Sequence, residues 1–153
     1  MPRVQREAQV TWKGNLVRGS GSITAATGAF EGLPYSLATR VEQPGGKTSP
    51  EELLAAAHAA CFAMSLAGEL TNAGSAPEHL DVQATVTLDE VEGGSHRIVS
   101  SDVLARAQVA DIDESALRRV AEAANRGCPF SALIEAGGRV TVNATLEGGA
   151  DGD

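Results

Sequence analysis

The most distinctive pattern of apolar positions begins near residue 49. Ser49 is followed by Pro50 and, three positions after the serine, by Glu52, an arrangement typical of a capping box with proline in the first helical position. Ala, Leu, Glu and Met then continue to Leu70, which predicts a helix of about 22 residues and about 33 Å. Because residues 53–67 are apolar on nearly every side, we expect this helix to be buried in the centre of a fold or in an oligomer interface.

Alternating polar and apolar residues predict strands on both sides of this helix. Before it we expect a hairpin that turns at Gly14-Asn15 and a half-buried strand near Tyr35. After it comes a strand whose apolar residues all share one face, then one strand or two broken at Ser100-Ser101, and a last strand near the end of the chain. The expected ranges are 9–16, 17–23, 35–42, 80–88, 97–109 and 139–146.

Two further helices are expected between the last two strand regions. An aspartate at 111 or 113 can cap a helix over about 114–125, and Cys128-Pro129 opens a short helical segment to about Glu135. Strands and helices do not alternate one for one, so the fold class is α+β, with antiparallel-rich sheets packed on the long helix. We expect one domain over residues 1–147, and a flexible acidic tail over 148–153.

Length and charge exclude several classes of function. The chain has 153 residues and a mass of 15.7 kDa, enough for one ordinary domain. Its formal net charge of −8 repels phosphate backbones, so nucleic acid is not an expected partner. No apolar run approaches the roughly 20 residues that span a bilayer, and residues 1–10 lack the apolar core of a signal peptide. We therefore expect a cytoplasmic protein without a membrane partner.

The two cysteines, Cys61 and Cys128, are too few for a disulfide scaffold or a closed zinc site. Cys61 lies inside the predicted long helix, where it could simply be a small core residue. Cys128 lies between Gly127 and Pro129 at a helix start, where backbone N–H groups stabilise a thiolate, although it could also be an incidental turn residue. If the fold brings the two close together, they can act as an attacking and a resolving thiol.

Four other side chains could support this chemistry. His58, one turn before Cys61, could be a base or half of a metal site, but two ligands make a weak metal argument and we favour a packing role. A cysteine that reacts with peroxide needs a nearby cation, for which Arg18 and Arg40 are candidates, and a carboxylate such as Glu51 can orient an arginine. The alternative for each charge is a solvated surface residue.

Four segments together resemble the OsmC/Ohr family of organic hydroperoxide reductases. The stretch 48–66, with SPEELLAAAHAACF, resembles the family's cysteine helix, and GCPFS at 127–131 resembles its second cysteine motif. YSLATRVE at 35–42 resembles its arginine strand, and WKGNLVRGSG at 12–21 its opening hairpin. The resemblance covers residues 7–147 and implies a cytoplasmic, intertwined α+β homodimer. It also implies a thiol-dependent peroxidase of oxidative and osmotic stress responses.

The resemblance also implies roles for individual residues. Cys61 matches the peroxidatic cysteine, Cys128 the resolving cysteine, and Glu51 the carboxylate that orients the catalytic arginine. With histidine at position 58, the motif AAHAAC resembles that of the OsmC-like branch, which suggests Arg40 as that arginine. The sister branch has tyrosine there and takes its arginine from the opening hairpin, which makes Arg18 the runner-up.

The implied reaction converts an organic hydroperoxide to an alcohol through a Cys61 sulfenic acid and a Cys61–Cys128 disulfide. An external dithiol, lipoyl-type or small, would reduce the disulfide, and no metal, haem or flavin is needed. We expect an apolar substrate pocket lined by Leu54, His58, Phe62, Phe130 and Leu133. The competing hypotheses are a non-catalytic small-molecule-binding dimer and a redox-sensing dimer of the same fold.

Helical geometry gives one further expectation. Glu51 and Cys61 are ten residues apart, so they lie about 15 Å apart along one helix and about 80° out of register. They cannot meet within one straight helix. We therefore expect a composite site in a homodimer, in which a second subunit supplies Glu51.

Overall fold

The computed structural model describes residues 2–148, so the predicted tail lies outside the described residues except for Gly148. The described chain divides into two compact units at the Leu53–Leu54 bond. We call residues 2–53 unit 1 and residues 54–148 unit 2 and describe each by itself. Two three-stranded sheets and a long helix give the α+β class that the sequence predicts.

Unit 1 contains an antiparallel sheet of three strands in the order β1-β2-β3. The strands are β1 (Ala8–Lys13), β2 (Ser20–Ala25) and β3 (Leu33–Tyr35). The predicted hairpin is therefore present with shorter strands. Gly21 pairs with Trp12 across the hairpin, and a Cβ at Gly21 would lie 2.5 Å from the ring of Tyr35. The missing side chain lets the Trp12 and Tyr35 rings approach to 5.6 Å between centroids.

The strand expected over 35–42 is wrong, because residues Leu37–Val41 form the short helix α1. Ser36 caps this helix: its hydroxyl accepts from the Thr39 amide at 3.2 Å, and the Thr39 hydroxyl accepts from the Ser36 amide at 2.9 Å. These two hydrogen bonds satisfy the Ser36 and Thr39 amides locally, whereas in a strand the amides would need a neighbouring strand as partner. The alternation of apolar residues over 35–42 is too short to favour a strand over this capped helix. Arg40 therefore projects from a helix and not from the end of a strand.

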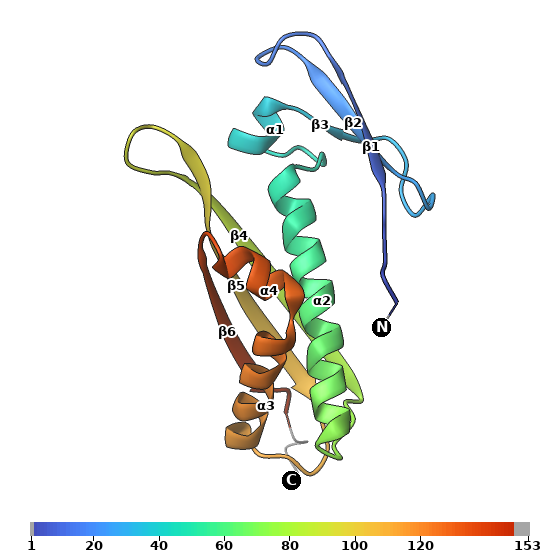
Figure 1. Ribbon diagram of the computed structural model, residues 1–153, viewed down its shortest axis with the longest axis vertical. Coiled ribbons are helices and arrows are strands. Elements are labelled where there is room, and N and C mark those ends of the chain that lie inside the picture. The colour runs from blue at the N-terminus through green and yellow to red at the C-terminus, as the bar shows by residue number, and fades with distance from the viewer. Residues whose placement is uncertain (1, 149–153) are drawn as a thin grey trace. The chain divides into compact units, whose positions relative to one another are not determined.

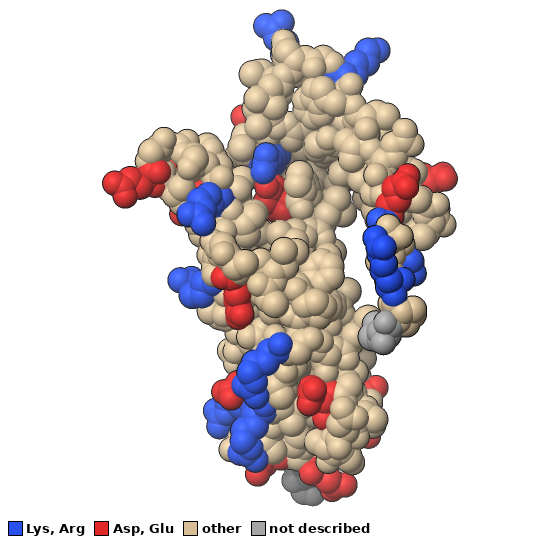
Figure 2. All heavy atoms as spheres, viewed as in Figure 1, with Lys and Arg blue, Asp and Glu red and all other residues tan. Residues whose placement is uncertain are grey.

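The long helix α2 (Pro50–Asn72) has 23 residues, close to the prediction. Ser49 is its N-cap, accepting the Leu53 amide on its carbonyl and the Glu52 amide on its hydroxyl at 3.2 Å each. Only half of the expected capping box forms, since the Glu52 carboxylate instead accepts from the Thr48 hydroxyl at 2.8 Å. Residues 53–68 carry no Lys, Arg, Asp or Glu, and the surface over the middle of α2 is correspondingly almost uncharged (Figure 2).

The expectation that no apolar run could span a bilayer was wrong for α2. By length and composition this helix is long and apolar enough to cross a membrane. The many alanines that make α2 apolar are equally suited to a helix in the core of a protein. Its residues His58, Phe62, Leu66 and Leu70 are spaced four apart and are buried, which is typical of a helix that packs on a protein core.

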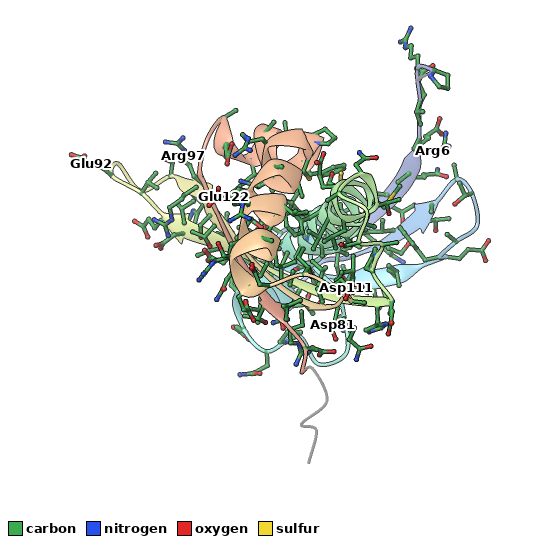
Figure 3. All side chains as sticks on the ribbon, turned by 90° about the horizontal axis from the view of Figure 1, so that it is seen from below. Arg6, Asp81, Glu92, Arg97, Asp111 and Glu122 are labelled. Carbon is green, nitrogen blue, oxygen red and sulfur yellow. The ribbon has the colours of Figure 1, made fainter. Side chains whose placement is uncertain are left out.

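Unit 2 is built on a second sheet with the order β4-β5-β6. Strand β4 (His79–Glu90) pairs antiparallel with β5 (His96–Gln108), with a register shift at Thr87/Leu88. The region 97–109 is thus one strand and not two. Strand β6 (Arg139–Leu146) lies parallel to β5, so one of the two pairings in this sheet is not antiparallel. Glu92, in the turn between β4 and β5, extends away from the helices (Figure 3).

The connection from β5 to β6 contains α3 (Glu114–Gly127), capped by Asp113, and α4 (Pro129–Glu135). Both run beside α2 in Figure 1. The elements α2, α3, β5 and β6 share one core, in which small residues dominate. Its members are Phe62, Leu66, Leu70, Val103, Ala105, Ala107, Leu117, Ala121, Ala124, Cys128 and Ala144.

Candidate active site

Cys61 of α2 and Cys128 lie 3.5 Å from each other in unit 2. Both are free thiols; Cys128 has no exposed surface, whereas Cys61 is half-buried. Two sulfurs at this separation need only a small movement to form a disulfide, whose bond is about 2 Å long. The proximity that the sequence left open is therefore present.

The position of Cys128 follows from the junction between two helices. Its amide donates to the Asn125 carbonyl at 3.2 Å and ends α3, while its carbonyl accepts from the Ala132 amide at 3.1 Å and begins α4. Its extended backbone, with φ −83° and ψ 114°, is what a residue before proline prefers. The predicted helix start is present, and it turns the amides of Phe130 and Ser131 toward the sulfur.

The two thiols differ in acidity. Burial raises the pKa of Cys61, and so does the hydrogen bond of its thiol to Cys128; the Phe130 amide opposes both. Burial also acts to raise the pKa of Cys128, but hydrogen bonds outweigh it and the net shift is downward. The donors are the amide and hydroxyl of Ser131, the thiol of Cys61 and the amide of Phe130. Within unit 2, Cys128 is thus the more acidic thiol.

His58 has no exposed surface and uses both ring nitrogens. Its Nδ1 lies 2.7 Å from the Ser101 hydroxyl of β5, and its Nε2 lies 2.8 Å from the Ser131 hydroxyl of α4. Burial lowers the pKa of His58, against the opposing charge of Glu135. The ring is therefore neutral at pH 7. Residues 2–148 contain no group of three or more His, Cys, Asp and Glu side chains placed to hold a metal ion.

Unit 1 contains the charged pair that the resemblance implies. The Nε and Nη2 atoms of Arg40 donate to Oε1 of Glu51 at 2.8 and 2.6 Å. The second oxygen, Oε2, is buried and has no hydrogen-bond partner among the described residues. One carboxylate oxygen thus fixes the Arg40 guanidinium in one orientation, and the other can still accept a bond.

Arg18 is placed differently. It lies in the turn between β1 and β2, where its amide donates to the Asn15 side chain at 2.9 Å, and its own side chain forms none of the ion pairs found in residues 2–148. Of the two candidate arginines, Arg40 is the one oriented by Glu51.

An apolar pocket of about 200 Å³ lies in unit 2 and is lined by Leu54, Ile98, Leu133, Ile134 and Gly137. Two of the residues expected around a substrate, Leu54 and Leu133, are therefore brought together. His58 and Phe62 are fully buried and Phe130 packs against the core, and none of the three lines this pocket.

Sequence reasoning missed two serines that contact His58. Ser131 carries a weak signal, because it lies three residues after Cys128 in the short α4. Ser101 carries none, since it is 43 residues from His58 and meets it only because β5 packs against α2.

Comparison with known proteins gives one consistent answer. A profile of the family described as OsmC-like protein matches residues 43–143. The chain is 37% identical to Peroxiredoxin OsmC of Escherichia coli (strain K12) over 133 residues, which covers 87% of this chain and 92% of that protein.

Solved structures agree on the fold. An organic hydroperoxide resistance protein OsmC from Legionella pneumophila matches with a TM-score of 0.68 at 20% identity, over 95% of this chain and all of that one (100%). An OsmC-like protein of unknown function from Vibrio cholerae matches with a TM-score of 0.73 at 14% identity, over 94% of this chain and 100% of the other.

Proposed function

The chain belongs to the OsmC-like family, and on that premise we propose that it is a cysteine-based peroxidase that reduces organic hydroperoxides to alcohols. The observation that carries this proposal is the pair of free thiols, Cys61 and Cys128, 3.5 Å apart on the family's two motifs. A binding protein needs neither thiol, and a purely structural core would not need a polar network around one of them.

The reaction has three steps. The Cys61 thiolate attacks the terminal oxygen of ROOH; the S–O bond forms, the O–O bond breaks, and the alkoxide leaves as ROH after taking a proton. Cys128 then attacks the sulfur of the Cys61 sulfenic acid, forming the disulfide and releasing hydroxide, which becomes water with the proton from Cys128. An external dithiol, lipoyl-type or small, reduces the disulfide by exchange and is itself oxidised.

The acidity order of the thiols suggests how Cys61 loses its proton. In unit 2 the Cys61 thiol donates its hydrogen bond to Cys128, the more acidic of the two. Cys128 can accept the proton through this hydrogen bond, but in unit 2 alone the transfer is uphill, because the Cys128 thiolate is the weaker base. A cation near Cys61 would favour this transfer, since it stabilises the new thiolate and the charge that develops on the peroxide.

We assign that cation to Arg40, oriented by Glu51, of a second subunit. Two observations support this assignment. Glu51 and Cys61 are both on α2, where ten residues of helical rise separate them by about 15 Å. Along the same helix an apolar stripe that the chain leaves exposed, Ala56, Ala60, Met64 and Gly68, lies beside Cys61, and Met64 is 77% exposed. A second copy that covered this stripe could bring its own Arg40 to Cys61.

The substrate is an organic hydroperoxide with an apolar group. The pocket lined by Leu54 and Leu133 supports this choice, because its apolar lining suits an apolar group. We place the protein in the cytoplasm, where thiols stay reduced between turnovers. The net charge of −8 argues against a nucleic acid partner.

Thiol counting tests the proposal. One equivalent of tert-butyl hydroperoxide should remove both free thiols within seconds. Cys61→Ser should abolish this loss, whereas Cys128→Ser should leave a sulfenic acid that can be trapped at Cys61. Unchanged thiols in the wild-type chain would contradict the proposal and favour a non-catalytic binding protein. Equal turnover of hydrogen peroxide and cumene hydroperoxide would contradict the substrate class.

A further inference from the structure

His58 connects the sheet to the resolving cysteine through hydroxyl groups. On one side its Nδ1 contacts Ser101 of β5, and on the other its Nε2 contacts Ser131 of α4. Ser131 lies three residues after Cys128 in the first turn of α4, where its hydroxyl can reach the sulfur of Cys128, and it acts to lower the pKa of that thiol. All four side chains have no exposed surface. The result is a continuous buried path, Ser101–His58–Ser131–Cys128, that ends on a sulfur.

The chemistry of the groups fixes the direction of the donors. A Cys128 thiolate has no proton, so the Ser131 hydroxyl must donate to it. The Ser131 oxygen then has only lone pairs left for His58, so Nε2 carries the ring proton. Because the buried ring is neutral, Nδ1 is an acceptor and the Ser101 hydroxyl must donate to it. Every donor therefore points toward the sulfur, and aligned hydrogen bonds polarise and strengthen one another.

We propose that His58 is a positioning residue for the resolving cysteine: it orients the Ser131 hydroxyl toward Cys128 and so holds Cys128 ready to attack oxidised Cys61. The part of this inference that concerns disulfide formation rests on the proposed peroxidase function. In that step the Cys128 thiolate forms the S–S bond, the S–O bond of Cys61 breaks, and the departing hydroxide takes up the proton that Cys128 gave up on ionising.

The charged and titratable neighbours of this path are few. Within the described residues, the thiol of Cys61 on α2 forms a hydrogen bond with Cys128. The charge of Glu135 on α4 acts on His58. Strand β5 contributes the uncharged Ser101 at this point. Neither titratable neighbour bonds Ser131, so a change at Ser131 tests the path itself.

A titration without peroxide gives the first test. Cys61→Ser leaves Cys128 as the chain's one cysteine, and the ultraviolet absorbance of its thiolate can be followed against pH. Adding Ser131→Ala or His58→Leu should raise the midpoint by about one pH unit, which is about tenfold less thiolate below it. Ser131→Thr, which keeps the hydroxyl, should restore the midpoint. Ser100→Ala, which removes another buried hydroxyl of β5, is the matched control and should not move it.

The second test follows the two chemical steps in the chain with both cysteines. With one equivalent of tert-butyl hydroperoxide, Ser131→Ala should slow disulfide formation about tenfold relative to sulfenic acid formation, with a pH profile displaced upward. The inference would be overturned if Ser131→Ala changed neither the titration midpoint of Cys128 nor the rate of disulfide formation relative to sulfenic acid formation. If His58→Leu does not fold, the comparison of Ser131→Ala with Ser131→Thr decides the question. Failure of the peroxidase proposal would appear separately, as a wild-type chain inert to peroxide whose Cys128 titration still depends on Ser131.

Discussion

Unit 1 and unit 2 differ in how they are stabilised. Among the described residues, Ile23 is the buried apolar residue of unit 1, whereas all other buried apolar residues belong to unit 2. Strand β1 is exposed along its whole length. A three-stranded sheet with so little core is marginal in water unless it packs on other apolar surface. Unit 2 contains a contiguous core and can hold side chains in fixed positions by packing alone.

The two units also differ in the kind of electrostatics they supply. Unit 1 contributes a full charge, Arg40, oriented by Glu51 and 38% exposed at its side chain. Unit 2 contributes uncharged dipoles, the amides and hydroxyls around Cys128. A full charge can shift the pKa of a thiol strongly, but only when it lies close to the sulfur. The buried dipoles around Cys128 are already in contact with its sulfur and act on its pKa at all times. We infer that unit 2 prepares the thiols and that unit 1 supplies the charge.

The largest expected difference between the units is in stability. Leu117→Ala removes a fully buried core side chain of unit 2 and should lower the free energy of unfolding by about 3 kcal/mol. Val17→Ala in unit 1 removes a side chain that is 76% exposed and should change it by less than about 0.5 kcal/mol. Urea denaturation of both variants measures the difference. Similar losses would show that unit 1 is as well packed as unit 2.

Arg40 should have the next largest effect, this time on catalysis. Arg40→Met keeps much of the side chain and removes the charge, and should lower the rate of Cys61 oxidation about a hundredfold. Arg18→Met is the matched control from the same unit and should change the rate less than about twofold. Stopped-flow measurement of peroxide reduction distinguishes the two. A larger loss in Arg18→Met would assign the charge to the β1–β2 turn instead.

Mixing subunits tests where that charge comes from. Under the composite-site proposal, Cys61→Ser homodimers are inactive and Arg40→Met homodimers keep only about one hundredth of the wild-type rate. A heterodimer contains one intact site, so random exchange of equal amounts should restore about a quarter of wild-type activity. Activity that never exceeds the sum of the two separate variants would contradict a site shared between subunits.

Glu51 should have a smaller effect, because it acts on the peroxide only through Arg40. Glu51→Gln keeps an oxygen that can accept from the guanidinium but loses the charge, and should slow Cys61 oxidation about tenfold. Glu52→Gln is the matched control, since Glu52 bonds Thr48 and not Arg40. An unchanged rate in Glu51→Gln would show that Arg40 is oriented without it.

The sequence predicted the features that depend on neighbours along the chain. Helix α2 was predicted nearly to its ends because Ser49, Pro50 and the alanine run act locally. Helix α1 was missed because two hydroxyls, Ser36 and Thr39, outweigh a short alternation. The parallel pairing of β5 with β6 and the contact of His58 with Ser101 join residues far apart in sequence. Such contacts follow from packing, which no local pattern encodes.

The smallest expected effect is the pH dependence that His58 gives to unit 2. Burial lowers the pKa of His58 below its ordinary value of 6.5, so below that pH the unfolded chain binds a proton that the folded chain does not. Stability should therefore be complete above about pH 6.5 and fall as the pH decreases toward the lowered pKa. Urea denaturation at about pH 7.5 and about pH 5.5 measures the fall.

His58→Gln, which keeps hydrogen-bonding groups between Ser101 and Ser131 but does not titrate, should lose less stability over this interval than the wild type. An equal fall in both chains would show that groups other than His58 cause the pH dependence of unit 2.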